Sequence, residues 1–283
     1  MKKRLSSIYL KLFIIFLYAP IAVLIFYSFN QSKSRQFTGF TLKWYKNMFH
    51  NSAILDGLST TLIIAFSAAI TSTFIGTFAA TGISNLKGKK KLAIMNLTYL
   101  PILNPEIITG VSFMLLFVTT RSIMNMLHMN FEFGWITLLI AHITINIPYV
   151  ILNVLPKINR LDRSLIDASM DLGCNPFQSF FKVIIHEIKP GIFAGFIMAL
   201  TFSMDDFVVS YFTTGIKHQP LSVLIYSMTK RRVSPEINAL SAMIFLVILI
   251  TLIIVNKNQK KRDHENKLFF YKNGGGSFAK KYK

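Results

Sequence analysis

The sequence contains few of the residues on which several classes of protein depend. Cys174 is the only cysteine among 283 residues, so no disulfide can form within the chain. Aspartate and glutamate together number 12 against 31 lysines and arginines, and charged residues make up only 15% of the chain. A soluble domain usually carries about 25% charged residues, so this composition argues against one.

Sequence motifs of common enzyme classes are also missing. The chain has no GxxxxGK[ST] phosphate-binding loop, no cysteine–histidine cluster with metal-ligand spacing and no GxSxG nucleophile elbow. The chain therefore has no P-loop with which to hydrolyse ATP, and we expect it to be non-catalytic, with no cofactor of its own.

Apolar runs are abundant, because 52% of the residues are hydrophobic. A helix needs about 20 apolar residues to cross the hydrocarbon core of a bilayer. Six runs are near this length, and Pro101, Pro105 and Gly110 interrupt the third. They are Ile8–Phe29, Leu58–Ile83, Leu92–Val118, Trp135–Leu155, Gly191–Phe212 and Ile237–Val255. The sequence thus predicts an all-α polytopic membrane protein with six transmembrane helices.

The net charge of +19 is concentrated in short segments between and after these runs. The main clusters are Lys2–Arg4, Lys87–Lys91, Lys157–Arg163 and Lys257–Lys283. Because basic residues favour the cytoplasmic side, this pattern predicts a cell-membrane protein with both termini in the cytoplasm. The trio Lys230–Arg232 in a predicted outer loop departs from the pattern. No recognition motif accompanies the charge, so we expect no nucleic-acid partner.

The runs and charges suggest three parts of the chain. Residues 1–56 are expected to form the first transmembrane helix and an outer segment whose "FTLKWYKNMF" stretch lies at the membrane interface. Residues 57–256 are expected to form the core with the other five helices, and residues 257–283 a disordered basic tail that touches anionic lipid.

The longest predicted inner loop, about residues 157–190, keeps helical spacing of its apolar residues. Gly173 followed by Asn175-Pro176 is typical of a helix end and a turn, and a second short helix is expected to run on to Pro190. We therefore expect a helix–turn–helix element on the cytoplasmic side.

Two adjacent carboxylates, Asp205 and Asp206, lie in the fifth apolar run, where a charge costs roughly 2.5–3.5 kcal/mol on insertion scales. On a continuous helix Ser203, Asp206 and Ser210 share one polar stripe. Asp206 is then expected to face a water-filled pathway, with Asp205 at its edge or against a neighbouring helix.

Glu106 is expected to supply a third carboxylate, beside the helix-breaking Pro105. Three carboxylates that face one cavity would suit a flexible polycation, because each offsets the dehydration of an ammonium group. Structural acids that bond to backbone or to basic residues of a partner remain the alternative.

The inner loop resembles the EAA loop of membrane subunits of ATP-binding-cassette importers. The resemblance rests on Asp167, Ala168, Ser169 and Gly173, followed by the apolar "FKVII" stretch. Asp167 and Ser169 replace a glutamate and an alanine of that motif, and Ile185-His186 replace a Leu-Pro pair. It implies that these residues couple the chain to a separate ATPase.

Segments along the whole chain are similar to one family, the second membrane subunit of bacterial spermidine/putrescine importers. These are "YAPIAVLIFYSFN", "AHITINIPYV", "FSMDDFVVSYFTTG" and "IYSMTKRRVSPEINAL". The resemblance implies a type I importer permease fold, a second permease subunit and a dimeric ATPase that binds ATP and Mg²⁺. It also implies an extracytoplasmic polyamine-binding protein.

Two other functions stay open on the sequence alone. One is import of another solute such as a metal cation, although paired carboxylates argue against an inorganic anion. The other is proton-coupled secondary transport, in which the same acids would relay protons.

Overall fold

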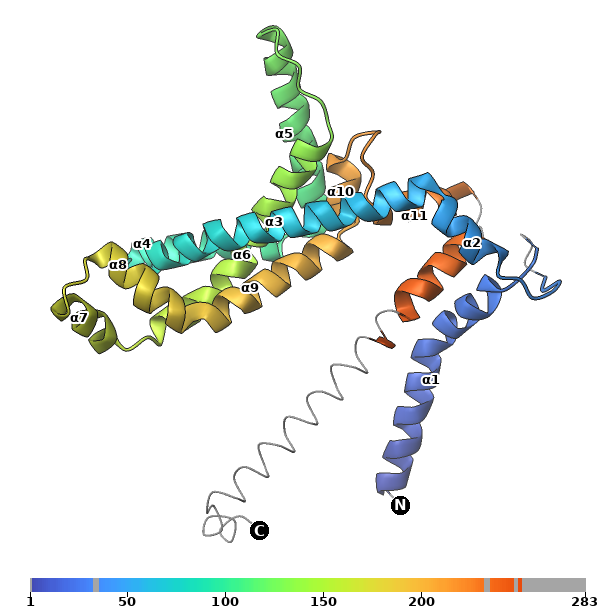
Figure 1. The fold of residues 1–283 in the computed structure, drawn as a ribbon, viewed down its shortest axis with the longest axis horizontal. Coiled ribbons are helices and arrows are strands. Elements are labelled where there is room, and N and C mark those ends of the chain that lie inside the picture. Colours follow the sequence, from blue (N-terminus) through green and yellow to red (C-terminus); the bar gives the residue numbers. More distant parts are fainter. Residues whose placement is uncertain (1, 33–35, 232–234, 247–248, 251–283) are drawn as a thin grey trace. The chain divides into compact units, whose positions relative to one another are not determined.

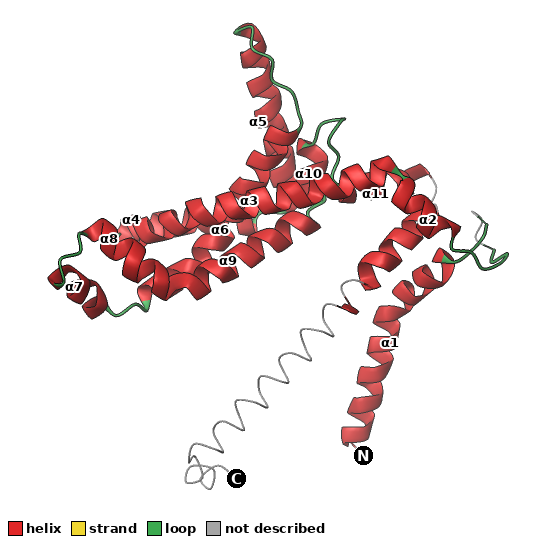
Figure 2. Cartoon of the chain, viewed as in Figure 1, coloured by secondary structure: helices red, strands yellow, loops and turns green. Residues whose placement is uncertain are grey.

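A computed structural model describes residues 2–32, 36–231, 235–246 and 249–250. Within these residues the chain is helical and contains no strand (Figure 2). An isolated bridge between Asn30 and Phe40 is its nearest approach to a sheet. The all-α prediction is therefore confirmed. The chain divides into two compact units, residues 1–50 with 228–283 and residues 51–227.

The described residues contain five helices that are long and apolar enough to cross a membrane. They are Ser7–Ser28, Ser52–Ser84, Glu106–Met126, Trp135–Asn159 and Pro176–Asp205. A shorter apolar helix, Pro235–Leu246, covers the start of the sixth predicted span. The rest of that span beyond residue 250, and the predicted tail of residues 257–283, lie outside the described residues.

The first unit contains helices α1 (Lys2–Ser28) and α2 (Lys43–His50), joined by a loop that Asn30 organises. The Asn30 side chain donates to the carbonyl of Gln36 and accepts from the backbone N–H of Thr38, and the Trp44 indole donates to the Asn30 carbonyl at 2.7 Å. Trp44 and Met48, one turn apart on α2, are buried. The aromatic stretch that the sequence marks as amphipathic is thus a short helix.

The second unit is built on three long helices that lie side by side, α3 (Ser52–Ser84), α6 (Trp135–Asn159) and α9 (Ile185–Asp205), as Figure 1 shows. The other elements that begin in this unit are α4 (Gly88–Leu103), α5 (Glu106–Met126), α7 (Arg163–Asp171), α8 (Pro176–Ser179), the π-helical turn η1 (Phe180–Ile184), α10 (Val208–Thr213) and α11 (Leu221–Arg231).

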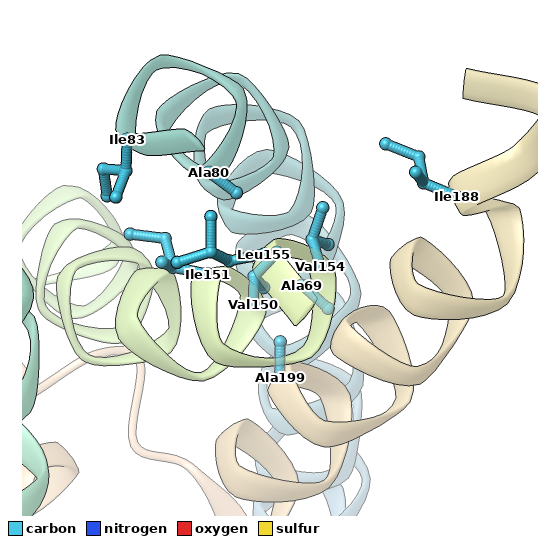
Figure 3. Close-up of a cluster of buried hydrophobic side chains, with 9 residues drawn as sticks. All are labelled: Ala69, Ala80, Ile83, Val150, Ile151, Val154, Leu155, Ile188 and Ala199. Atoms are coloured by element: carbon cyan, nitrogen blue, oxygen red, sulfur yellow. The ribbon is translucent and has the colours of Figure 1, made fainter. Parts of the chain in front are cut away.

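The core of this unit is made mostly of small and β-branched side chains from the three long helices (Figure 3). It contains Ala69, Ala80, Ile83, Val150, Ile151, Val154, Leu155, Ile188 and Ala199. Glycines let the helices approach closely: a Cβ on Gly76 would lie 2.7 Å from the Val150 side chain, and one on Gly195 would lie 3.2 Å from its Cα. Such small-residue contacts are the usual means of packing helices within a membrane.

The third predicted span, Leu92–Val118, is interrupted at Pro105 as the sequence indicates, and the helix long enough to cross a membrane is Glu106–Met126. The chain breaks between α4 and α5, where Asn104 is extended (ψ 139°) and Pro105 precedes the first residue of α5. A residue before proline is sterically driven out of the helical region, which explains the break. Pro101, by contrast, lies within α4.

The fifth predicted span, Gly191–Phe212, is wrong at both ends. One helical segment begins at Pro176, passes through η1 and ends at Asp205, so the predicted helix end at Pro190 is also wrong. Asp206 is extended (ψ 126°), and α10 begins two residues later. Continuous helical residues therefore connect the end of the inner loop to the paired aspartates.

We predict that Gly76→Leu destabilises the second unit by about 1–3 kcal/mol, because a larger side chain would overpack the contact with Val150. Gly82→Leu on the same helix is the matched control, since a Cβ there meets no atom within 4 Å. The measurement is the melting temperature of the purified protein in detergent. Equal melting temperatures for the two variants would contradict the packing of α3 on α6.

Candidate functional site

A cavity of about 240 Å³ lies where the two broken helices of the second unit meet α6. Glu106 enters it from the start of α5, and Asp205 and Asp206 from the end of α9. Its other polar lining residues are Asn104, Thr109, His142, Asn146 and Tyr149. The structure thus brings together the three carboxylates that the sequence singles out, next to hydrogen-bonding groups of α6.

The Asp206 side chain holds the helix break in place. Its two carboxylate oxygens accept hydrogen bonds from the backbone N–H groups of Val209 (3.2 Å) and Ser210 (2.7 Å), at the start of α10. The backbone carbonyl of Asp206 accepts a hydrogen bond from the Ser222 hydroxyl at 2.9 Å. Capping bonds of this kind satisfy N–H groups that have no partner within the helix.

Two buried pairs connect α6 to the segments on either side of this break. His142 Nε2 lies 3.0 Å from the Ser210 hydroxyl and 3.6 Å from a carboxylate oxygen of Asp206. One turn further along α6, the Asn146 amide donates to the Ser203 hydroxyl at 2.7 Å. Ser203 and Ser210 are buried, so they position the break and do not line the cavity.

The three carboxylates differ in exposure. The Asp206 side chain is 13% exposed, whereas Asp205 and Glu106 are exposed. The prediction that Ser203, Asp206 and Ser210 share one stripe of a continuous helix is wrong, because the helix ends at Asp205. The Asp206 carboxylate accepts hydrogen bonds from the start of α10, and the Asp205 carboxylate is the more accessible of the two.

The sequence analysis missed the contribution of α6 to this cavity. His142, Asn146 and Tyr149 recur at the i, i+4 and i+7 spacing that places residues on one helical face. Tyr149 also stacks on Phe202, with ring centroids 4.1 Å apart. A polar stripe within an otherwise apolar run was the signal that could have identified them.

A second candidate site is the turn between α7 and α8. Gly173 adopts a left-handed conformation (φ 87°), its N–H donates to the Met170 carbonyl, and the N–H of Cys174 donates to the Ser169 carbonyl. These two bonds form a Schellman motif, which requires a residue with positive φ directly after the helix. The predicted helix end at Gly173 is therefore confirmed.

The other residues of the EAA-like segment differ in surroundings. Asp167 and Ala168 are exposed on α7, whereas the Ser169 hydroxyl is buried 2.6 Å from the Ser179 hydroxyl and fixes α7 against α8. Asp162 caps α7, and hydrogen bonds from the backbone N–H and then the hydroxyl of Ser164 lower the pKa of its carboxyl group.

Large apolar side chains are exposed around this turn. Leu172, just before Gly173 in the sequence, is 87% exposed, and Phe177, four residues after it, is 70% exposed. Exposed apolar groups beside a rigid, polar helix pair are typical of a surface that binds another protein.

The chain is similar to membrane components of binding-protein-dependent transport systems. Residues 72–257 match the family model described as "Binding-protein-dependent transport system inner membrane component". The spermidine/putrescine transport system permease protein PotC of Escherichia coli (strain K12) is 33% identical over 243 residues, which cover 86% of this chain and 88% of the relative. The putrescine transport system permease protein PotI of the same strain is 33% identical over 255 residues, with 87% and 89% covered.

A solved structure has the same fold. The crystal structure of a bacterial ABC transporter involved in the import of the acidic polysaccharide alginate contains a chain that matches with a TM-score of 0.69. The match covers 92% of this chain and 96% of that one, at 15% sequence identity. At that identity the likeness concerns the fold and not the solute.

We predict that Asp206→Ala lowers stability by about 1 kcal/mol, the usual cost of removing a capping side chain. Asp206→Asn should lower stability less, because the amide oxygen still accepts one of the two capping bonds. The melting temperatures of the two purified variants provide the test. If Asp206→Ala melts with the parent, the carboxylate does not hold the break.

Proposed function

Because the chain belongs to the family of binding-protein-dependent transport system inner membrane components, we propose that it is the permease subunit of an ATP-driven polyamine importer. The observation that carries this proposal is the cavity that Glu106, Asp205 and Asp206 line together. The chain forms half of a translocation pathway, and a second permease subunit forms the other half.

The cavity suits a polyamine by charge and by its other lining groups. An ammonium group that leaves water loses its hydration, and a nearby carboxylate offsets that cost. Asp205 and Glu106 are exposed and contact the ammonium groups, while Asp206 adds negative charge from a more covered position. Tyr149 and Phe202 supply aromatic surface beside them, to which cations are also attracted.

The names of the relatives support this choice of solute. PotC of Escherichia coli is named for spermidine and putrescine, and PotI for putrescine. Two relatives with different printed solutes are equally similar to this chain, so the proposal extends to linear polyamines as a class.

A separate, dimeric ATPase supplies the energy in this proposal, and it binds the ATP and Mg²⁺. It docks on the turn between α7 and α8, where Leu172 and Phe177 are exposed and the Ser169–Ser179 pair keeps the two helices rigid. This turn then faces the cytoplasm, as do both termini. An extracytoplasmic polyamine-binding protein delivers the solute to the opposite side.

We predict that Asp205→Asn and Glu106→Gln each reduce ATP-driven spermidine uptake at least ten-fold, since a hydrogen bond to a charged group contributes about 1.5–3 kcal/mol. Asp206→Asn, which keeps one of the two capping bonds, should reduce uptake less. The measurement is uptake of labelled spermidine by vesicles that contain the complete importer at matched protein levels. Glu132→Gln, outside the cavity, is the control.

The relative effects assign the roles of the carboxylates. If Asp206→Asn abolishes uptake while Asp205→Asn does not, Asp206 makes the direct contact. If all three variants transport at the parental rate, the carboxylates are structural and the proposed polyamine pathway is wrong.

We further predict that Gly173→Trp uncouples ATP hydrolysis from uptake, because it strains the turn and adds bulk to the docking surface. A Cβ at Gly173 meets no atom within 4 Å, so the fold itself should tolerate the change apart from the cost of positive φ. Gly88→Trp is a matched control, since Gly88 also has positive φ (58°) and open space. Solute-stimulated ATPase activity should fall several-fold in the first variant only; equal activities would exclude this docking site.

A further inference from the structure

An apolar groove of about 600 Å³ runs between α3 and the η1–α9 segment, away from the carboxylate cavity. Phenylalanines line both walls, with Phe74 and Phe78 on α3 and Phe181, Phe193 and Phe196 on the other side. Phe74 is 65% exposed and Phe193 66% exposed, so part of the groove is open. Nothing in the carboxylate pathway or the ATPase-docking turn uses this surface.

Lys189 is the charged residue among those that line the groove. It is the last ionisable residue of α9 before Asp205, so it lies where this helix leaves its polar end for the apolar span. Phe78 near the C-terminal end of α3 contacts Phe180, with ring centroids 5.6 Å apart, so the lysine-rich segment after α3 follows on the η1 side of the groove. Lys87, Lys89, Lys90 and Lys91 follow there.

A polar atom without a partner lies in the wall. The Thr77 hydroxyl is buried, and it is the buried side-chain polar atom for which the described part of the chain provides no hydrogen bond. Buried hydroxyl groups are normally hydrogen-bonded, so its place in the groove wall points to an acceptor that enters from outside the chain. Thr77 is only 6% exposed, yet it lines the groove.

We propose that this groove binds an anionic phospholipid of the leaflet on the α7–α8 side. The lipid phosphate pairs with Lys189, an ester carbonyl accepts from the Thr77 hydroxyl, and one acyl chain lies along the phenylalanines. In a lipid the phosphate, the ester carbonyl and the acyl chain follow one another toward the membrane centre, which is the order of the contacts proposed here. From Thr77 to Ile70, and from Lys189 to Phe196, the helices rise roughly 10 Å, enough for about half of an acyl chain.

The charge of Lys189 favours a lipid over an apolar protein helix. Its exposed ammonium group lies 3.0 Å from His186 Nδ1, and an anionic headgroup neutralises the positive charge there, whereas an apolar helix would leave it without a counter-charge. Between Pro176 and Met204 the only acidic residue in the sequence is Glu187, and Glu187 does not line the groove.

Quenching of a tryptophan by brominated lipids tests the proposal directly. The full chain, purified with its accompanying subunits, carries the reporter Phe193→Trp and is reconstituted into mixed phosphatidylcholine–phosphatidylglycerol vesicles with one lipid brominated. We expect phosphatidylglycerol to bind at the reporter about five-fold more tightly than phosphatidylcholine, the factor typical of one lysine at a membrane surface. The parent chain, which contains two tryptophans, provides the background.

Two matched variants assign the preference to the groove. Lys189→Gln should bring the ratio of the two binding constants close to one, whereas Lys182→Gln, an exposed lysine outside the groove, should leave it unchanged. A reporter placed instead at Leu97, exposed on α4, should show a ratio near one.

A second measurement tests the hydroxyl contact. The rise in melting temperature on adding phosphatidylglycerol to the detergent-purified protein should be smaller in Thr77→Val than in the parent. Equal quenching by both lipids, or a full rise in Thr77→Val and Lys189→Gln, would overturn the proposal. Absence of quenching by either lipid would overturn it as well, and would show that a protein helix covers the groove. Solute uptake does not enter these measurements, so their outcome is independent of the proposed substrate.

Discussion

The structure around the cavity depends on Asp206, which lies at the break after α9 and makes hydrogen bonds to the segments on both sides of it. The Asp206 N–H donates to the Phe202 carbonyl as the last bond of α9, its carboxylate accepts from Val209 and Ser210, and its carbonyl accepts from Ser222. Unsatisfied backbone groups are costly within a bilayer, so an irregular segment persists there only where such partners exist or where it lines a cavity. Both conditions hold here.

The break has consequences for its neighbours. It turns α10 toward α5, where Gly110 gives close approach to Phe212, and the Thr137 hydroxyl on α6 donates to the Thr213 carbonyl at 2.8 Å. Residues of α6 and of the end of α9 line the cavity together with residues on both sides of the α4–α5 break at Pro105, and α3 packs against α6 and α9 behind them. The carboxylates therefore come from two chain interruptions that a rigid three-helix core holds in place.

The sequence predicted those features that a short stretch of residues determines. The lengths of the apolar runs predicted the long helices, Pro105 predicted the α4–α5 break, and Gly173 predicted the end of α7. The end of α9 was missed because helical periodicity assumes continuity. Whether an aspartate faces a pathway or caps the next helix depends on the backbone that follows it.

Features that depend on distant residues could not be predicted in the same way. The pairing of His142 with Ser210 joins positions 68 residues apart, and the Asn146–Ser203 bond joins positions 57 apart. The grouping of Glu106 with the paired aspartates likewise requires the packing of α5 on α10. The sequence supplied the residue types, and the tertiary contacts supplied their arrangement.

The helical segment from Pro176 to Asp205 joins the exposed turn to the carboxylate cavity without a loop between them. Phe177 lies near one end of the segment and Asp205 at the other. The segment passes through the π-helical turn η1 and contains Pro190, two features at which helices bend. A change of angle at η1 would therefore alter the position of the exposed turn relative to the carboxylate without unfolding either part of the helix.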